Sequence, residues 1–415
     1  MNAPLKIDMM EATRLTREGR LKEAMVLLRG VLNVVPSGDA PTDFAGGARR
    51  PSAEGSPCTI DMAPPSIETG NSWMHAGAGR GSTSPSPTAG SMLEFLNRRG
   101  RSHRGDALFG LARPASRGAT APVAHGARFE ERSFANGAGR RTYKLYVPSG
   151  YAGQALPLVV MMHGCTQSPD DFAAGTGMNA LAEEQVFLVA YPAQAQSANV
   201  SKCWNWFSVG DQQRDLGEPS LIAGLTRQIM REFPVLPGRV YVAGLSAGGA
   251  AAAVLGAEYP DLYAAVGVHS GLACGAATDL SSALTAMRQG GHSGAGPNGH
   301  GGSRAAVPTI VFHGDRDAIV NPINGDQVIA QARGAATSRS TIDRGMTPGG
   351  ISYTRTVEAD QSDRPILEQW VLHGAGHAWS GGNAAGSYTN PRGPDASREM
   401  IRFFLQQPSS ARSPS

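Results

Sequence analysis

The clearest chemical signal in the chain is a run of five residues, GLSAG at positions 244–248, which fits the pattern G-x-S-x-G. In this pattern a serine occupies a sharp turn between a strand and a helix, where its hydroxyl is exposed for attack on a carbonyl carbon. Apolar residues 240–243 precede the run as a predicted strand, and small residues 248–255 follow it as a predicted helix. We therefore predict that Ser246 is a nucleophile; the alternative is a serine that only shapes a turn.

A serine hydroxyl needs a base to remove its proton and a carboxylate to orient that base. Two aspartates, Asp315 and Asp317, follow a strand predicted at 309–312. They fall at the carboxyl edge of the predicted sheet, where open α/β sheets build their sites. We predict Asp317 as the acid because it lies far enough past the strand to turn back toward a histidine. Asp315 is expected to cap the turn.

Two histidines follow the last predicted strand, at 367–372, in a glycine-rich loop. His377 follows Gly376 in this loop, and we predict that it is the general base. His373 stands directly at the end of the strand and is expected to be structural. The order of the three predicted residues along the chain is then serine, acid, histidine, as the G-x-S-x-G arrangement requires.

Acyl transfer also needs hydrogen-bond donors for the oxyanion that develops in the transition state. The N–H of Ala247, next to the serine, is the first candidate. The N–H of Cys165 is the second, because it follows the apolar run 158–162 and the pair His163-Gly164. An ordinary strand-to-helix turn is the alternative interpretation of His163-Gly164.

Six segments spread over about residues 128–406 resemble the polyhydroxybutyrate depolymerase type of esterase, within the α/β-hydrolase fold. The segments are HGCTQSPDDFA, VAYPAQ, CWNWF, VAGLSAGGA, VFHGDRDAIVN and HGAGHAWSGG. The resemblance implies Ser246, Asp317 and His377 as a catalytic triad and Cys165 as an oxyanion residue, in agreement with the assignment from the residues alone. It also implies a disulfide between Cys165 and Cys203, although a reducing cytoplasm would disfavour such a bond.

Three tryptophans near the predicted site elements are candidates for contact with the substrate. Trp204 and Trp206 lie in the segment CWNWF, and Trp379 lies two residues after His377. An apolar stacking surface would suit a polyester or an aromatic acyl group. The alternative is that these side chains pack the core beneath the site.

After Arg128, short β-rich runs alternate with helical patterns, which predicts an α/β domain with a mostly parallel sheet and helices on both faces. Strands are expected at 143–147, 158–162, 187–190, 240–243, 265–268, 309–312 and 367–372, and helices at 171–185, 220–232, 248–258, 324–333 and 395–406. We expect this catalytic domain to span residues 128–407, with a disordered tail at 408–415. A glycine-rich insertion between Cys274 and Val307 is expected to be a mobile surface loop, with metal binding by its His292 and His300 as the alternative.

The first third of the chain lacks the alternation of strand and helix patterns and differs in composition. Residues 1–35 are predicted to form a helical hairpin, which either docks a partner or packs on its own protein. Residues 36–127 are rich in Gly, Pro, Ser and Arg and are predicted to be a largely disordered linker.

Charge and the lengths of apolar runs limit which partners and locations we expect. The chain has 37 Lys+Arg against 34 Asp+Glu, a net charge of +3 that gives no electrostatic argument for a nucleic-acid partner. No apolar run reaches the ~18 to 20 residues of a membrane span, and the first residues lack the apolar stretch of a secretory signal. We therefore expect a cytoplasmic protein, with export as the alternative because members of the family are often exported. No cofactor and no metal are expected.

The sequence thus predicts a serine carboxylesterase that acts on poly- or oligo-hydroxyalkanoates through an acyl-enzyme. A feruloyl, acetylxylan or general short-chain esterase is the alternative within the same chemistry, and a serine peptidase would use the same triad. A granule- or partner-binding protein that uses residues 9–35 is the alternative from another class.

Overall fold

The computed structural model describes residues 121–291, 307–333 and 338–407. The predicted N-terminal hairpin, nearly all of the linker, residues 292–306 with His292 and His300, and the C-terminal tail lie outside these residues. The prediction of a surface loop between Cys274 and Val307 is wrong for its first part, because residues 280–289 form a helix that buries Ala283, Ala286 and Met287.

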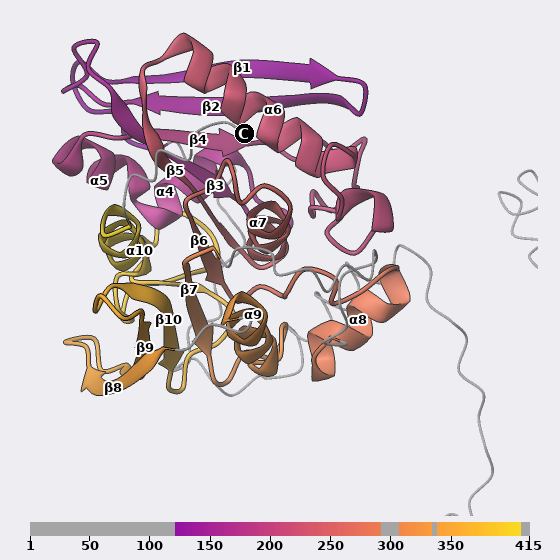
Figure 1. Cartoon of the computed structure of the whole chain (residues 1–415), viewed down its shortest axis with the longest axis vertical. Helices are drawn as coiled ribbons and strands as arrows, with labels where there is room; N and C mark the ends of the chain where they lie inside the picture. Colours follow the sequence, from indigo (N-terminus) through magenta and orange to yellow (C-terminus); the bar gives the residue numbers. More distant parts are fainter. Residues whose placement is uncertain (1–120, 292–306, 334–337, 408–415) are drawn as a thin grey trace, which may run out of the picture. The chain divides into compact units, whose positions relative to one another are not determined.

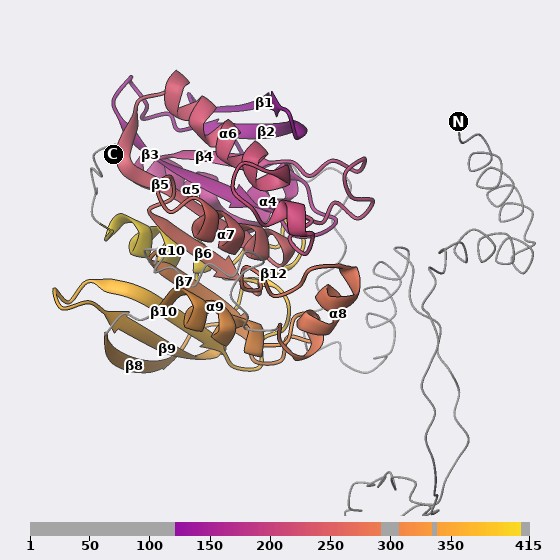
Figure 2. The ribbon, with the colours of Figure 1, turned by 45° about the vertical axis from the view of Figure 1, so that its right-hand side comes forward.

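One ten-stranded sheet forms the centre of the described fold, with the order β1-β2-β4-β3-β5-β6-β7-β10-β9-β8. The strands are β1 Arg128–Asn136, β2 Gly139–Val147, β3 Leu156–Met162, β4 Leu188–Pro192, β5 Val235–Leu245, β6 Ala265–His269, β7 Thr309–Gly314, β8 Arg339–Met346, β9 Ser352–Ala359 and β10 Pro365–Leu372. From β4 to β10 all neighbours in this order are parallel, whereas β1, β2, β8 and β9 pair antiparallel at the two edges. In Figure 2 the sheet runs from β1 at the top to β8 at the bottom.

Helices cover both faces of this sheet (Figure 1). They are α4 Pro169–Thr176, α5 Met178–Gln185, α6 Gly217–Glu232, α7 Ala247–Glu258, α8 Leu280–Gln289, α9 Ile323–Arg333 and α10 Ala396–Leu405, with a short 3₁₀ helix η1 at Val209–Asp211. The buried side chains of α6, α7, α8 and α9 share one hydrophobic cluster, and those of α4, α5 and α10 share another. The two clusters are the two cores on either side of the sheet.

The central strand β3 explains why this sequence needs two covered faces. Leu158, Val160 and Met162 belong to the core with α6 and α7, while Val159 and Met161 belong to the core with α4 and α5. Because alternate residues of a strand point to opposite faces, a continuous apolar run is stable only when both faces are buried.

The predicted fold class is confirmed: a mostly parallel sheet carries helices on both faces. The sequence missed β1 and the hairpin β8–β9 because their side chains are largely polar and nearly all half-buried or exposed, so no alternating apolar pattern marks them. None of the described helices is long and apolar enough to cross a membrane.

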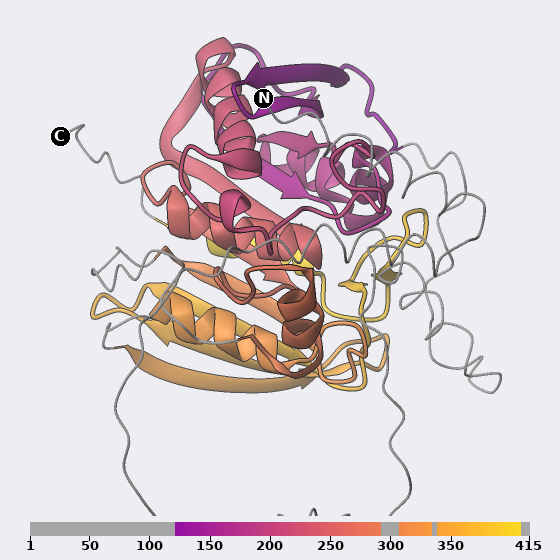
Figure 3. The same cartoon turned by 90° about the vertical axis from the view of Figure 1, so that its right-hand side faces the viewer.

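A second, two-stranded sheet follows β10, where β11 Trp379–Ser380 pairs with β12 Thr389–Asn390. Its loop is tied to the end of α4, because the N–H of Asn383 donates to the carbonyl of Gly175 at 2.8 Å. Figure 3 shows the yellow ribbon of this segment at the right of the view, away from β8 and β9. The chain after β10 therefore turns back across the carboxyl edge of the central strands.

Candidate active site

Ser246 occupies the turn between β5 and α7. Its backbone has φ 58° and ψ −120°, a conformation that L residues rarely adopt and that functional turns often retain. Both flanking glycines are required by packing: a Cβ on Gly248 would lie 2.1 Å from the carbonyl oxygen of Met162, and one on Gly244 would lie 2.3 Å from that of Gly248. The end of β3 thus touches the start of α7, which is the close approach that the glycines of the pattern permit.

Asp317 and His377 form a hydrogen-bonded pair. Nδ1 of His377 donates to Oδ2 of Asp317 at 2.7 Å, and the N–H groups of Ile319 and Val320 donate to Oδ1 at 2.9 Å each. Burial alone would raise the pKa of Asp317, but the adjacent His377 and hydrogen bonds from His313 and His377 outweigh it and hold this pKa well below its usual value. The carboxylate is therefore ionised and fixes the His377 ring, leaving Nε2 to exchange a proton.

His269, a residue without a role in the sequence analysis, connects the histidine loop to the serine turn. Strands β6 and β7 lie between β5 and β10 in the sheet. The loop after β10 that carries His377 must therefore pass over the ends of β7 and β6 to approach Ser246. The main-chain carbonyl of His269 accepts the N–H of Ser246 at 2.9 Å, and its Nε2 accepts the N–H of Ser380 at 3.0 Å. The ring stacks on Trp379 with centroids 5.2 Å apart. His269 therefore holds both segments against the end of β6.

Burial, together with the neighbouring His313 and His377, lowers the pKa of His269 to about 3, so the ring stays neutral and Nε2 remains an acceptor. The sequence signal was present but weak: His269 ends the buried strand β6 at the edge that also carries the serine turn. A histidine at the end of an apolar strand is usually structural, and only the fold shows what it supports.

Two backbone donors lie near Ser246, one at the start of α7 and one in the loop after β3. A disulfide joins Cys165 to Cys203, as the resemblance implied. Ala247 is the first residue of α7, so its N–H has no acceptor within the helix. The N–H of Cys165 donates to no acceptor within the described parts of the chain. Both N–H groups are therefore available to a ligand oxygen.

His163 fixes the orientation of the peptide that carries the Cys165 N–H. Its Nδ1 donates to the carbonyl of Gly164 at 2.7 Å, and its Nε2 accepts the N–H of Gln194 at 3.1 Å. Burial lowers the pKa of His163 to about 4, so this neutral tautomer persists at neutral pH. The Gly164 carbonyl and the Cys165 N–H belong to one planar peptide unit, in which they point in opposite directions. Fixing one therefore aims the other.

The family model described as "Esterase PHB depolymerase" matches residues 141–339, which contain the serine turn, Asp317 and the Cys165 loop. This region is therefore similar to the polyhydroxybutyrate depolymerase type of esterase. His377 lies beyond the matched region, so its pairing with Asp317 comes from the structure alone.

Curated relatives are similar to this chain in sequence, and a solved structure is similar to it in fold. The chain is 34% identical over 239 residues to poly(3-hydroxyalkanoate) depolymerase C of Paucimonas lemoignei, covering 56% of this chain and 57% of that protein. It is 29% identical to the probable acetylxylan esterase A of Aspergillus clavatus, covering 43% and 61%. The acetyl xylan esterase of Aspergillus awamori superposes with a TM-score of 0.54 at 20% identity over 67% of this chain and 99% of that one, a likeness of fold. The chain thus spans about three fifths of the length of each of these two curated relatives.

A second acid–histidine pair lies beside the first. Nδ1 of His373 and Oδ2 of Asp315 are 2.9 Å apart, Oδ1 of Asp315 accepts the N–H of Gly374, and Nε2 of His373 bonds Thr354. Both ring nitrogens of His373 thus have partners at the surface. This arrangement agrees with the structural roles expected of Asp315 and His373.

The three predicted substrate-contact tryptophans are buried, with exposed fractions of 0% for Trp204, 4% for Trp206 and 1% for Trp379. The indole N–H of Trp204 donates to the carbonyl of His163, and that of Trp379 donates to Ser397. These contacts favour the alternative that the side chains pack beneath the site. A role as substrate contacts stays a prediction.

The described residues contain no group of three or more His, Cys, Asp or Glu side chains arranged to hold a metal ion.

Proposed function

We propose that the protein is a serine carboxylesterase in which Ser246 is the nucleophile, His377 the general base and Asp317 the residue that orients it. The observation that carries the proposal is the buried, ionised Asp317 bonded to His377 in a domain whose serine turn has the strained backbone of a nucleophile. A comparable resemblance of fold without this pair would not support hydrolysis.

In the proposed reaction, Nε2 of His377 takes the hydroxyl proton as Oγ of Ser246 attacks the ester carbonyl. The carbonyl π electrons move to its oxygen, which the N–H groups of Cys165 and Ala247 stabilise. The tetrahedral intermediate collapses, the bond to the alkoxy group breaks, and His377 returns its proton to the leaving alcohol. Water, deprotonated by His377, then attacks the acyl-enzyme in the same way and releases the carboxylic acid and free Ser246.

For the substrate, we propose the ester bonds of poly- or oligo-hydroxyalkanoates. Support comes from the family match and from the relatives in Paucimonas lemoignei and Ralstonia pickettii, which are named as depolymerases of poly(3-hydroxyalkanoate) and poly(3-hydroxybutyrate). Acetylxylan or feruloyl esters are the second candidate, because fungal acetylxylan and feruloyl esterases are also similar to this chain.

The experiment is a side-by-side assay of short p-nitrophenyl esters, hydroxybutyrate oligomers, amorphous polymer, acetylxylan and a feruloyl ester, with Ser246→Ala as the control. Turnover of oligomers or polymer that falls by roughly four orders of magnitude in Ser246→Ala supports the proposal. Preferential turnover of acetylxylan or the feruloyl ester identifies the second candidate. Full activity in Ser246→Ala overturns the mechanism.

A further inference from the structure

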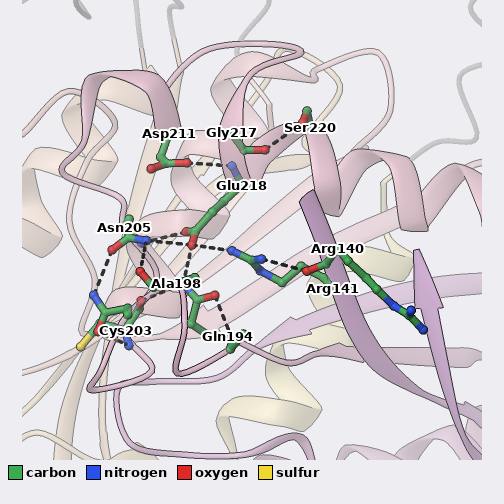
Figure 4. Close-up of polar contacts among 12 residues, drawn as sticks. Arg140, Arg141, Gln194, Ala198, Cys203, Asn205, Asp211, Gly217, Glu218 and Ser220 are labelled. Carbon is green, nitrogen blue, oxygen red and sulfur yellow. Dashed lines mark hydrogen bonds and ion pairs between the residues drawn. The ribbon is translucent and has the colours of Figure 1, made fainter. Parts of the chain in front are cut away.

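Glu218, in the first turn of α6, is a buried carboxylate that the proposed chemistry does not use. Only 7% of the residue is exposed, yet its two oxygens accept four hydrogen bonds (Figure 4). Arg141 Nη2 lies at 3.1 Å, Asn205 Nδ2 at 3.0 Å and the Asn205 main-chain N–H at 2.8 Å; the amide of Gln194 is the fourth donor. Every partner is a donor, so the cluster requires an acceptor-only group, which an ionised carboxylate is.

These donors hold one short segment, residues 203–205, from two sides. Asn205 is bound by Glu218 through both its main chain and its side chain. Gln194 donates from the same amide nitrogen to Glu218 and to the carbonyl of Cys203, the latter at 2.9 Å. Figure 4 shows Glu218 between Arg141 and this segment. The carboxylate therefore links strand β2, helix α6 and the chain around Cys203.

The same segment is bound to the loop that carries the Cys165 N–H. Cys203 is joined to Cys165 by the disulfide. The indole N–H of Trp204 donates to the carbonyl of His163 at 3.0 Å, and the main-chain N–H of Gln194 donates to Nε2 of His163. A continuous series of bonds thus runs from Glu218 to the peptide proposed to bind the oxyanion.

We propose that Glu218 is a positioning residue that holds the loop 163–166, and with it the Cys165 N–H, in the geometry that oxyanion binding requires. Its contact with the loop is indirect, through Asn205, Gln194 and Cys203. This inference rests on the proposed esterase function. Loss of a positioning contact acts on the transition state more than on substrate binding, because the oxyanion exists only after attack has begun.

The test compares Glu218→Gln with Glu258→Gln. Gln at 218 places an NH₂ group among donors and leaves at least one of them without an acceptor. Glu258 is the matched control: it is also 7% exposed and accepts a main-chain N–H, that of Arg214 at 2.9 Å, but it lies at the end of α7 opposite Ser246. Asn205→Ala is a milder second variant, which keeps the test open should Glu218→Gln fail to fold.

Two readouts are measured on each folded variant. The first is kcat and KM on p-nitrophenyl butyrate; we expect kcat of Glu218→Gln to fall roughly 10- to 100-fold with KM nearly unchanged, and Glu258→Gln to stay within about 3-fold of wild type. The second is hydrogen exchange, which we expect to become faster in peptides covering 163–167 and 201–206 but not in those covering the serine turn.

Equal losses of kcat in Glu218→Gln and Glu258→Gln, or exchange at 163–167 that matches wild type, would overturn the inference. Failure of the proposed function looks different: wild type would then hydrolyse no ester, or Ser246→Ala would retain activity. Even in that case, unchanged exchange in Glu218→Gln would show that Glu218 does not hold the loop, and faster exchange would show that it does.

Discussion

Asp317 bonds His377 across two loops that follow the adjacent parallel strands β7 and β10. The same two loops also carry the pair Asp315–His373, at a similar distance of 2.9 Å. Burial separates the two pairs: the side chains of Asp317 and His377 are 0% and 9% exposed, whereas those of Asp315 and His373 are 37% and 43% exposed. A buried carboxylate interacts with its partner through a lower dielectric than a solvated one, so the inner pair is suited to orient a base.

Comparing the two pairs tests which aspartate orients the catalytic histidine. We expect Asp317→Asn to lower kcat on p-nitrophenyl butyrate by about three to four orders of magnitude, because an amide at this position favours the wrong tautomer of His377. Asp315→Asn should lower kcat by no more than about 3-fold. Steady-state kinetics on both variants, with circular dichroism to verify folding, makes the comparison. A larger loss in Asp315→Asn would move the acid to Asp315 and the base to His373.

We expect substitutions of His269 to lower kcat, because this residue bonds the serine turn and the segment that follows His377. His269→Gln keeps an acceptor for the Ser380 N–H, whereas His269→Phe keeps the ring that stacks on Trp379 but removes that acceptor. We expect kcat of His269→Phe to fall roughly 10-fold or more, since the histidine loop loses a hydrogen bond, and His269→Gln to lose less. Kinetics of the two variants at matched stability measures this. Equal activity in both variants and wild type would exclude the positioning role.

The sequence could predict the Asp317–His377 pair, the turn at Ser246 and most of the sheet because each depends on local order, whereas the triad as a whole stays a prediction. When a strand is followed by G-x-S-x-G, or by a histidine in a glycine-rich loop, the side chain lies at the carboxyl edge of the parallel sheet. This placement does not depend on distant parts of the chain. The role of Glu218 could not be predicted, since its partners Arg141, Gln194 and Asn205 meet only in the folded chain. The exposed strand β8 was missed because it has no apolar pattern and is held in the extended conformation by its pairing with β9.

Stability should depend on pH through the two buried histidines near the site. The pKa values of His163 and His269 are lowered to about 4 and about 3 by burial, so the unfolded chain binds more protons than the native state between these values and about 6.5. The free energy of unfolding must then fall as the pH falls through this window, by up to about 1.4 kcal/mol per pH unit for each histidine.

Urea unfolding of wild type and His163→Asn at pH 6.5 and pH 5 tests this dependence. Asn keeps a donor near the Nδ1 position but does not titrate, so the stability lost between the two pH values should be about 1.5 kcal/mol smaller in the variant. His125→Asn, in which an exposed histidine is changed, is the control and should follow wild type. An identical pH dependence in His163→Asn and wild type would show that His163 is not held neutral.

The disulfide between Cys165 and Cys203 gives a prediction about both thiol chemistry and the site. The sequence has four cysteines, so no more than two thiols should react in denaturant without reductant, and four after reduction. Four reactive thiols before reduction would exclude the bond.

Because the segment around Cys203 is also held by Glu218 and Trp204, we expect the double variant Cys165→Ser, Cys203→Ser to keep activity within about 10-fold of wild type. Its free energy of unfolding should fall by about 2 to 4 kcal/mol, measured in urea, since the unfolded chain regains the freedom that the bond removes. Such a bond persists in oxidising compartments, so detection of bridged protein in cells would favour export over the cytoplasmic location expected from the sequence.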